Sequence, residues 1–98
     1  MYLKIHHNQS GKIIAVCDED LIGKVLEDEN KYMDLDKFRN FYIGEKVSEE
    51  KVNEALKSFG SVNIVGKKSV KIAIDMKLVG KQDIMYINRV PYIQIYNI

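Results

Sequence analysis

The chain has 98 residues, of which 46% are hydrophobic and 30% are charged, and its formal net charge at pH 7 is +1. This length predicts a single domain over residues 1–98 that can bury a core, and the composition excludes a disordered chain. A net charge this close to zero does not by itself indicate a nucleic-acid partner.

Cysteine usage and the N-terminus indicate a cytoplasmic protein. Cys17 is the single cysteine, so an internal disulfide cannot form and a secreted disulfide framework is excluded. Residues 1–7 lack the basic start and long apolar run of a signal peptide. The longest apolar run, Ile13 to Cys17, is far too short to span a membrane, so we expect no membrane partner.

Charge is unevenly distributed along the chain. Residues 18–36 contain eight acidic side chains and two lysines, whereas residues 61–98 contain six basic side chains and two aspartates. One interpretation is a pair of solvated faces of opposite sign. The other is a basic patch for an anionic partner, with the acidic segment turned away from it.

The N-terminal quarter predicts a β-hairpin followed by a helix. Residues 2–6 and 12–17 have strand composition, and turn-forming residues that include Gly11 separate them. The second strand is apolar on both faces, which is typical of the centre of a sheet. Asp18 is in position to cap a following helix whose apolar face would run from Leu21 to Leu26.

The middle of the chain contains the clearest helix. A short strand is expected at residues 32–35, and an aromatic cluster occupies residues 38–43. Ser48 is then in position to cap a helix. Its apolar residues recur at helical spacing, namely Val52, Ala55, Leu56 and Phe59.

The C-terminal third predicts strands at 62–65, 84–87 and 92–96, and it leaves residues 67–79 open. As a strand, alternate residues from Val70 to Leu78 are apolar, and this local pattern is slightly the better one. As a helix, Val70, Ala73 and Ile74 share a face with Lys77, and Ile72 and Met76 would pack elsewhere.

Cys17 and the acidic residues were considered for catalysis and metal binding. The thiol lies near an expected helix start, which would favour the thiolate, and His6 lies on the neighbouring strand. The adjacent acidic charges oppose thiolate formation, so Cys17 is better interpreted as a buried apolar group. His6 and His7 point to opposite faces of a strand and cannot share a metal ion. We therefore predict no catalytic residue, no cofactor and no metal site.

Four aspartates could supply oxygen ligands for magnesium or calcium, but their spacing matches no EF-hand loop. They are Asp18, Asp20, Asp34 and Asp36. A solvated acidic face is the better interpretation of them.

The segment from Gly66 to Ser69 is the most suggestive part of the chain. It resembles the end of a phosphate loop, although the upstream glycine of a nucleotide-binding P-loop is missing. If it begins a helix, free amide groups and the lysines would converge on one phosphate, such as a phosphate of RNA. The alternative is that Lys67 and Lys68 point into water.

Aromatic and basic residues recur in the last expected hairpin. Tyr86, Tyr92 and Tyr96 could stack on unpaired bases beside Arg89, or they could pack beneath a helix. No established RNA-binding motif is present. The predicted nucleic-acid-binding residues are Gly66, Lys67, Lys68, Ser69, Lys71, Arg89 and Tyr92.

Short segments across the chain resemble those of a small archaeal family of unknown function, which is sometimes labelled as predicted RNA-binding. These segments are Cys17 to Lys24, Phe41 to Glu45, Asn63 to Val70 and Val90 to Tyr92. The resemblance implies a cytoplasmic archaeal protein close to translation or tRNA metabolism, and it implies a helix after Gly66. It offers no catalytic residue.

With that helix, the element order is β-β-α-β-α-β-α-β-β, an α+β fold with one mixed sheet and helices packed on it. The first functional hypothesis is a non-enzymatic RNA-binding or translation-associated module, which would hold phosphates of tRNA or rRNA at the helix start from Gly66 to Ser69. The second is a protein-interaction subunit or homodimer, which would use the edge strand beside Pro91 or the aromatic cluster at 38–43. The third is a small enzyme that uses Cys17 with His6.

Overall fold

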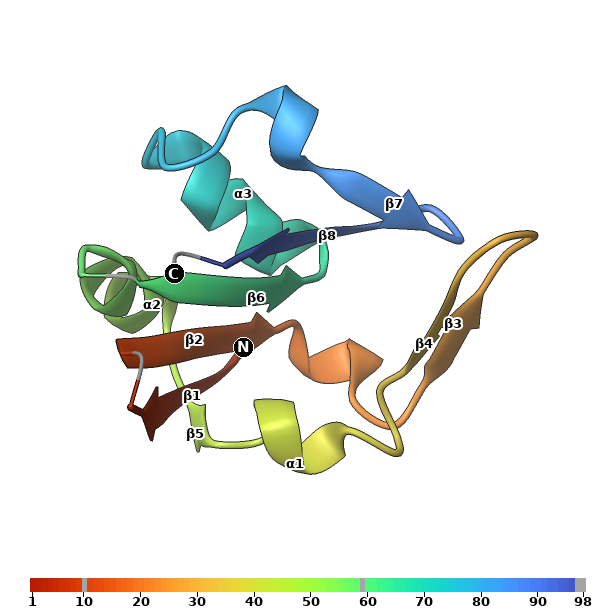
Figure 1. Cartoon of the computed structure of the whole chain (residues 1–98), viewed down its shortest axis with the longest axis horizontal. Coiled ribbons are helices and arrows are strands. Elements are labelled where there is room, and N and C mark those ends of the chain that lie inside the picture. Colours follow the sequence, from red (N-terminus) through yellow and green to blue (C-terminus); the bar gives the residue numbers. More distant parts are fainter. Residues whose placement is uncertain (10, 59, 97–98) are drawn as a thin grey trace.

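The computed structural model describes residues 1–9, 11–58 and 60–96 of the chain (Figure 1). Six strands of this described part form one mixed sheet in the order β5-β1-β2-β6-β8-β7. They are β1 (Tyr2–Asn8), β2 (Gly11–Cys17), β5 (Glu45–Lys46), β6 (Ser61–Val65), β7 (Met85–Ile87) and β8 (Val90–Ile95). The predicted α+β class with a mixed sheet is confirmed.

Two strands that are distant in sequence form the centre of the sheet. β2 and β6 run parallel, and Cys17 lies beside Val65 at their C-terminal ends. Antiparallel hairpins flank this pair, because β1 pairs with β2 on one side and β8 joins β6 to β7 on the other. The segments that begin at Asp18 and Gly66 therefore start side by side, at the C-terminal ends of these two central strands.

The helix predicted from Leu21 to Leu26 is wrong. After β2 the chain makes a single 3-10 turn, Glu19–Leu21, and then forms strand β3 (Val25–Glu27). β3 pairs with β4 (Tyr32–Asp34) in a separate two-stranded sheet. The reason is that Gly23 has a positive φ of 90°, which reverses the chain so that Leu21 and Leu26 are both buried without a continuous helix.

Helix α2 (Glu49–Leu56) begins after Ser48, as predicted, and buries Val52 and Leu56. The side chain of Ser48 nevertheless makes no capping hydrogen bond, so the expected side-chain cap is absent. Phe59, the last residue of the predicted apolar pattern, lies outside the described residues. The aromatic segment before α2 contains a short helix that the sequence pattern did not predict, α1 (Arg39–Tyr42).

Helix α3 (Lys67–Asp75) confirms the choice of a helix after Gly66, but it is shorter than the predicted range of 67–79. The chain leaves the helix at Lys77, whose φ is 61°. Its amide N–H donates to the carbonyl oxygen of Ile74 at 2.9 Å, and that of Leu78 donates to Ala73 at 3.2 Å. This hydrogen-bond pair is a Schellman ending, and a 3-10 turn (Lys81–Asp83) follows before β7.

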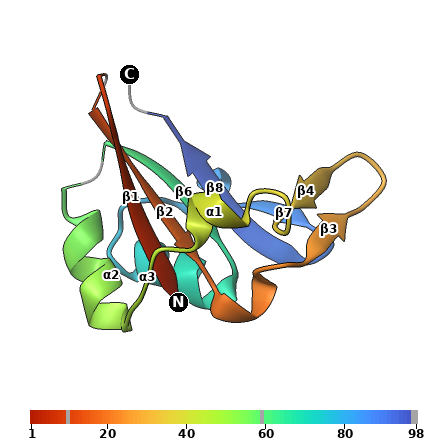
Figure 2. The same ribbon diagram turned by 90° about the horizontal axis from the view of Figure 1, so that it is seen from below.

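The sheet has a core on each face, and β2 contributes to both. Ile14 and Val16 pack with residues of α2 and α3, whereas Ala15 and Cys17 pack with residues of α1 and the β3–β4 hairpin. Figure 2 shows α2 and α3 on one side of the sheet, and α1 with the hairpin on the other. The prediction that β2 is a central strand covered on both faces is confirmed. In the part of the chain that the structure describes, we find no helix with the length and apolar character needed to cross a membrane.

Candidate nucleic-acid interface

The first turn of α3 is capped by Asp18, which follows the neighbouring strand β2. The carboxylate of Asp18 accepts hydrogen bonds from the amides of Lys68 at 3.1 Å and Ser69 at 2.9 Å. It also accepts one from the hydroxyl of Ser69 at 2.6 Å. The parallel pairing of β2 with β6 brings these groups together, since the amide of Asp18 donates to Val65 at 3.0 Å. Asp18 therefore caps α3 and not the helix that was expected to follow it.

This cap corrects the predicted phosphate pocket at Gly66 to Ser69. Two amide groups that an external anion would need already bind a carboxylate of the chain itself, and the side chain of Ser69 is fully buried. Gly66 has a φ of 113°, and a Cβ atom at this position would overlap the side chain of Asp18. Gly66 and Ser69 thus have structural roles in the close approach of the two segments.

Lys68 and Tyr92 also lie apart from the other predicted site residues. Lys68 lines a hollow that it shares with the acidic side chains of Glu19, Asp20 and Glu49. Tyr92 is buried in the core beneath the β3–β4 hairpin, and the ammonium group of Lys31 lies 5.6 Å from the centre of its ring. Its ring therefore has no exposed face on which a base could stack.

The other three predicted residues, Lys67, Lys71 and Arg89, line one hollow of about 310 Å³ between α3 and the β7–β8 hairpin. Tyr86 lines the same hollow and is 56% exposed. The remaining lining residues are apolar, namely Val70, Ile74, Ile84 and Pro91. We call this site the basic hollow.

Arg89 is presented by a two-residue turn. Ile87 pairs with Val90, and the two residues between them, Asn88 and Arg89, have φ values of 46° and 67°. Two successive positive φ angles are typical of a type I′ turn, in which the second position favours glycine. Arg89 therefore holds a backbone conformation that costs about 1 kcal/mol for a residue with a side chain.

The β3–β4 hairpin ties this turn down. The carboxylate of Asp28 accepts a hydrogen bond from the amide of Asn88 at 3.0 Å, and this bond lowers the pKa of Asp28. The ammonium group of Lys31 donates to the carbonyl oxygen of Tyr86 at 2.8 Å. The expectation that the acidic segment turns away from the basic residues is therefore wrong at Asp28, which contacts the turn that carries Arg89.

The charges around the basic hollow are only partly compensated. Lys71 forms an ion pair with Asp75 one turn further along α3, with 2.6 Å between the ammonium nitrogen and the carboxylate oxygen. Within residues 1–9, 11–58 and 60–96, Lys67 and Arg89 take part in no ion pair. These two exposed cations are therefore available to an anionic ligand.

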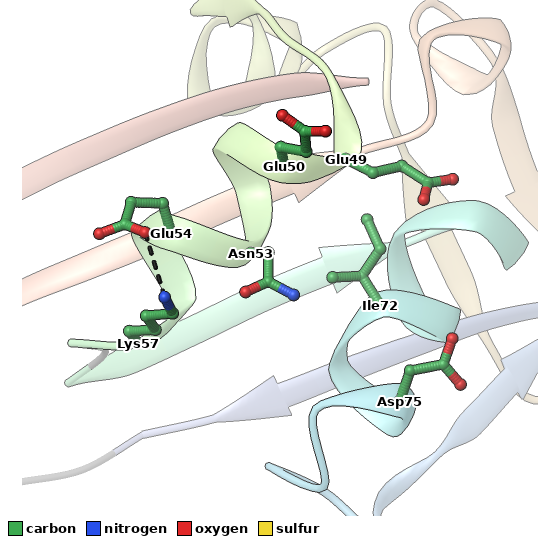
Figure 3. A pocket seen from close by; sticks show the side chains of 7 residues that line it. All are labelled: Glu49, Glu50, Asn53, Glu54, Lys57, Ile72 and Asp75. Atoms are coloured by element: carbon green, nitrogen blue, oxygen red, sulfur yellow. Dashed lines mark hydrogen bonds and ion pairs between the residues drawn. The ribbon is translucent and has the colours of Figure 1, made fainter.

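A second hollow, of about 360 Å³, lies on the other side of α3 and is acidic. Figure 3 shows Asn53 of α2 and Ile72 of α3 facing each other across it, with Glu49, Glu50 and Asp75 around its rim. Lys57 also lines this hollow, and its ammonium group forms an ion pair at 3.2 Å with the carboxylate of Glu54, another lining residue. This acidic hollow, which we call the acidic groove, repels anionic groups such as phosphates.

Cys17 and His6 do not form a catalytic pair. Burial, together with the charge of Asp18, raises the pKa of the Cys17 thiol to about 12. His6 pairs with Ile13 across the hairpin, and its Nε2 lies 2.9 Å from the carbonyl oxygen of Phe41. The hairpin register therefore places His6 and Cys17 at different positions along the sheet, and the raised pKa keeps the thiol protonated near neutral pH.

The residues considered for metal binding do not gather. Within the described ranges, no three His, Cys, Asp or Glu side chains converge as a metal site would require. The carboxylate of Asp34 instead accepts hydrogen bonds from the backbone amides of Asp36 at 3.0 Å and Lys37 at 2.8 Å. These two hydrogen bonds stabilise the turn after β4.

The aromatic cluster at 38–43 is mostly used inside the molecule. The ring of Phe41 stacks on His6 with 4.4 Å between the ring centres, and Tyr42 is buried. Phe38 remains 57% exposed. A protein partner at this cluster stays a prediction, and the exposed surface available to it is narrower than the sequence pattern indicated.

A family model described as "Protein of unknown function (DUF424)" matches residues 5–98 of the chain. The chain belongs to the DUF424 family. A solved structure described as an uncharacterized conserved protein from Methanopyrus kandleri resembles this DUF424 member with a TM-score of 0.78 and 25% sequence identity. The match covers 97% of this chain and 89% of that one. A comparison with curated proteins gives no match. The expected membership in a family of unknown function is thus confirmed, with an archaeal protein as a structural relative.

Tyr86 is the exposed aromatic residue of the basic hollow, and the predicted site omitted it. Its position on a short strand next to the turn with Arg89 was visible in the sequence, but so were two other tyrosines of the same hairpin. The pairing of β7 with β8 distinguishes Tyr86 from Tyr92, because it places Tyr86 opposite Pro91 and Tyr92 on the other, buried face of the hairpin.

Proposed function

We propose that this protein binds RNA and that the basic hollow is its contact surface. The observation that carries the proposal is the meeting of Lys67, Lys71 and Arg89 around one apolar floor beside the exposed ring of Tyr86. Cationic side chains bind phosphates, and aromatic and apolar surfaces accept a base or a ribose. These groups come from α3 and from the β7–β8 hairpin, so the site depends on the folded chain.

The backbone of Arg89 supports this proposal. Its left-handed conformation at φ 67° costs free energy that a glycine in the same turn would avoid. A strained residue of this kind is frequently found where a side chain serves binding. We infer that the guanidinium group at this position has a role in binding that outweighs the backbone cost.

The acidic surroundings limit how RNA approaches. Asp28 contacts the far side of the turn, and the acidic groove lies on the opposite side of α3. In the proposed complex the RNA backbone therefore runs over the start of α3 and the β7–β8 hairpin. Binding depends mainly on phosphate contacts and weakens as the salt concentration rises.

The test is a fluorescence anisotropy titration of labelled bulk tRNA at about 50 mM salt, near the low end where phosphate contacts are strongest. We expect saturable binding by the wild-type protein and about tenfold weaker binding by Arg89→Gly, because one charge-assisted contact is lost. Lys77→Gly is the matched control, since it also replaces a positively charged residue of positive φ with glycine but lies outside the basic hollow.

Two results would overturn the proposal. If the wild-type protein shows no binding to tRNA under these conditions, RNA is not its ligand. If Arg89→Gly and Lys77→Gly weaken binding equally, the interaction follows overall charge and does not use the basic hollow.

A further inference from the structure

Among the described residues that line the basic hollow, Tyr86 is the single exposed aromatic ring, and with the apolar floor it suits a base that is outside a stack. This inference rests on the proposed RNA-binding function and concerns the class of RNA. The floor is formed by Val70, Ile74 and Ile84, with the ring of Tyr86 beside it. Bases in a duplex are covered on both faces by their neighbours, so they cannot offer a face to this ring. The apolar part of the hollow therefore contributes only when a base is unpaired.

The part of a ligand that the hollow can hold is about one nucleotide. Its volume of about 310 Å³ lies at the small end of the range for sites that enclose small molecules. Other strongly exposed aromatic residues, Tyr32, Phe38 and Tyr96, are not part of its lining. A row of stacked bases would need a series of such rings, which the described lining does not provide.

The charges also indicate a short contact. Lys71 is paired with Asp75, which leaves Lys67 and Arg89 as the uncompensated cations of the basic hollow. Asp75 also lines the acidic groove, so the positive surface ends within one turn of α3. A protein that follows a duplex backbone needs many phosphate contacts, and this surface offers about two.

We infer that the basic hollow captures one unpaired nucleotide of an RNA chain. Its base lies against Tyr86 and the apolar floor, and its flanking phosphates contact Lys67 and Arg89. A single strand, a loop or an overhanging end supplies such a nucleotide, whereas a blunt duplex does not.

The experiment compares two labelled probes of the same sequence, each about ten nucleotides long, as an unstructured single strand and as a blunt RNA duplex. Anisotropy titrations at about 50, 100 and 200 mM salt give the affinities and their salt dependence. We expect the single strand to bind about tenfold more tightly than the duplex. Two phosphate contacts to a single strand predict that log K falls with log salt with a slope of about −1.4.

Tyr86→Ala identifies the base contact. Loss of base stacking is expected to weaken single-strand binding about tenfold and to leave the salt slope unchanged, since no charge is removed. Phe38→Ala is the matched control, because it removes an exposed ring of the same kind that lies outside the hollow. It should bind the single strand like the wild-type protein.

The outcomes separate this inference from the proposed function. Equal or tighter binding of the duplex, or unchanged binding by Tyr86→Ala, would overturn the single-nucleotide inference and leave RNA binding intact. Failure of the single strand, the duplex and tRNA alike to bind would overturn the proposed function itself.

Discussion

The carboxylate of Asp18 binds both the hydroxyl and the amide of Ser69, a residue 51 positions away in the chain. This contact joins the end of β2 to the first turn of α3, and both side chains are buried. It occupies the helix start with an internal anion. The amides of Lys68 and Ser69 are therefore not available to an external phosphate.

Asp18→Asn is expected to lower the free energy of unfolding by about 2–3 kcal/mol. The substitution removes the charge and leaves at least one N–H group of the helix start without an acceptor. Urea unfolding followed by circular dichroism measures the change. Asp20→Asn, at an exposed neighbouring position, should stay within about 0.5 kcal/mol of the wild-type value. Equal unfolding midpoints for the two variants would contradict the role given to Asp18.

Arg89→Gly should raise the free energy of unfolding by about 0.5–1 kcal/mol, because glycine adopts the positive φ of this turn without strain. Lys77→Gly should do the same at the end of α3, where a glycine is the usual residue of a Schellman ending. Thermal unfolding of the two variants measures the gain. Together, the thermal unfolding and the binding titration show whether Arg89 lowers the stability of the fold while strengthening the binding of a ligand. A loss of stability in Arg89→Gly would mean that its side chain supports the fold.

Cys17 should react very slowly with iodoacetamide in the native protein at pH 8 and rapidly in urea. Burial raises its pKa from 9.0 to about 12, so the reactive thiolate is scarce in the folded state. Because the folded pKa is the higher one, the stabilisation linked to this thiol is complete below about pH 9 and is lost as the pH rises towards 12. Mass spectrometry counts the modified chains. Rapid native labelling would show that Cys17 is accessible.

Acid should loosen the contact between the β3–β4 hairpin and the β7–β8 turn. The hydrogen bond from the amide of Asn88 lowers the pKa of Asp28 below 3.8, so this contact is present at neutral pH and is lost as the pH falls through the lowered pKa. Asp28→Asn should have a similar effect at neutral pH. Hydrogen exchange of the Asn88 amide measures both. Glu29→Gln, on the same exposed loop, is the control that should leave this exchange unchanged.

Local sequence patterns predicted the parts of the fold that depend on near neighbours. The β1–β2 hairpin and α2 were found because strand alternation and helical spacing each act over a few residues. Residues 67–79 show the limit of such patterns. Val70, Ile72 and Ala73 are all buried because α3 packs on the sheet and on α2 together, and an apolar face this wide also fits strand alternation.

The candidate site could be predicted only in part. The sequence indicated Lys67, Lys71 and Arg89 by their charge, which these side chains keep whatever fold the chain adopts. The partner of Asp18 could not be read from the sequence, because a capping residue is usually assigned to the helix that follows it, whereas here the helix is 49 residues further along. The structure excludes Ser69 and Tyr92 from the site because both are buried. Their burial depends on the order of the strands in the sheet, which local sequence patterns do not determine.

The parallel pairing of β2 with β6 also determines when the chain can complete its fold during synthesis. The hairpin of β1 and β2 emerges from the ribosome early, with apolar side chains on both faces of its second strand. Its central partner follows only after the whole connection up to Ser61 has been made. Contacts this distant in sequence slow folding and leave apolar surface open to other chains. We therefore expect the β1–β2 hairpin to expose apolar surface until β6 has been synthesised and has paired with β2.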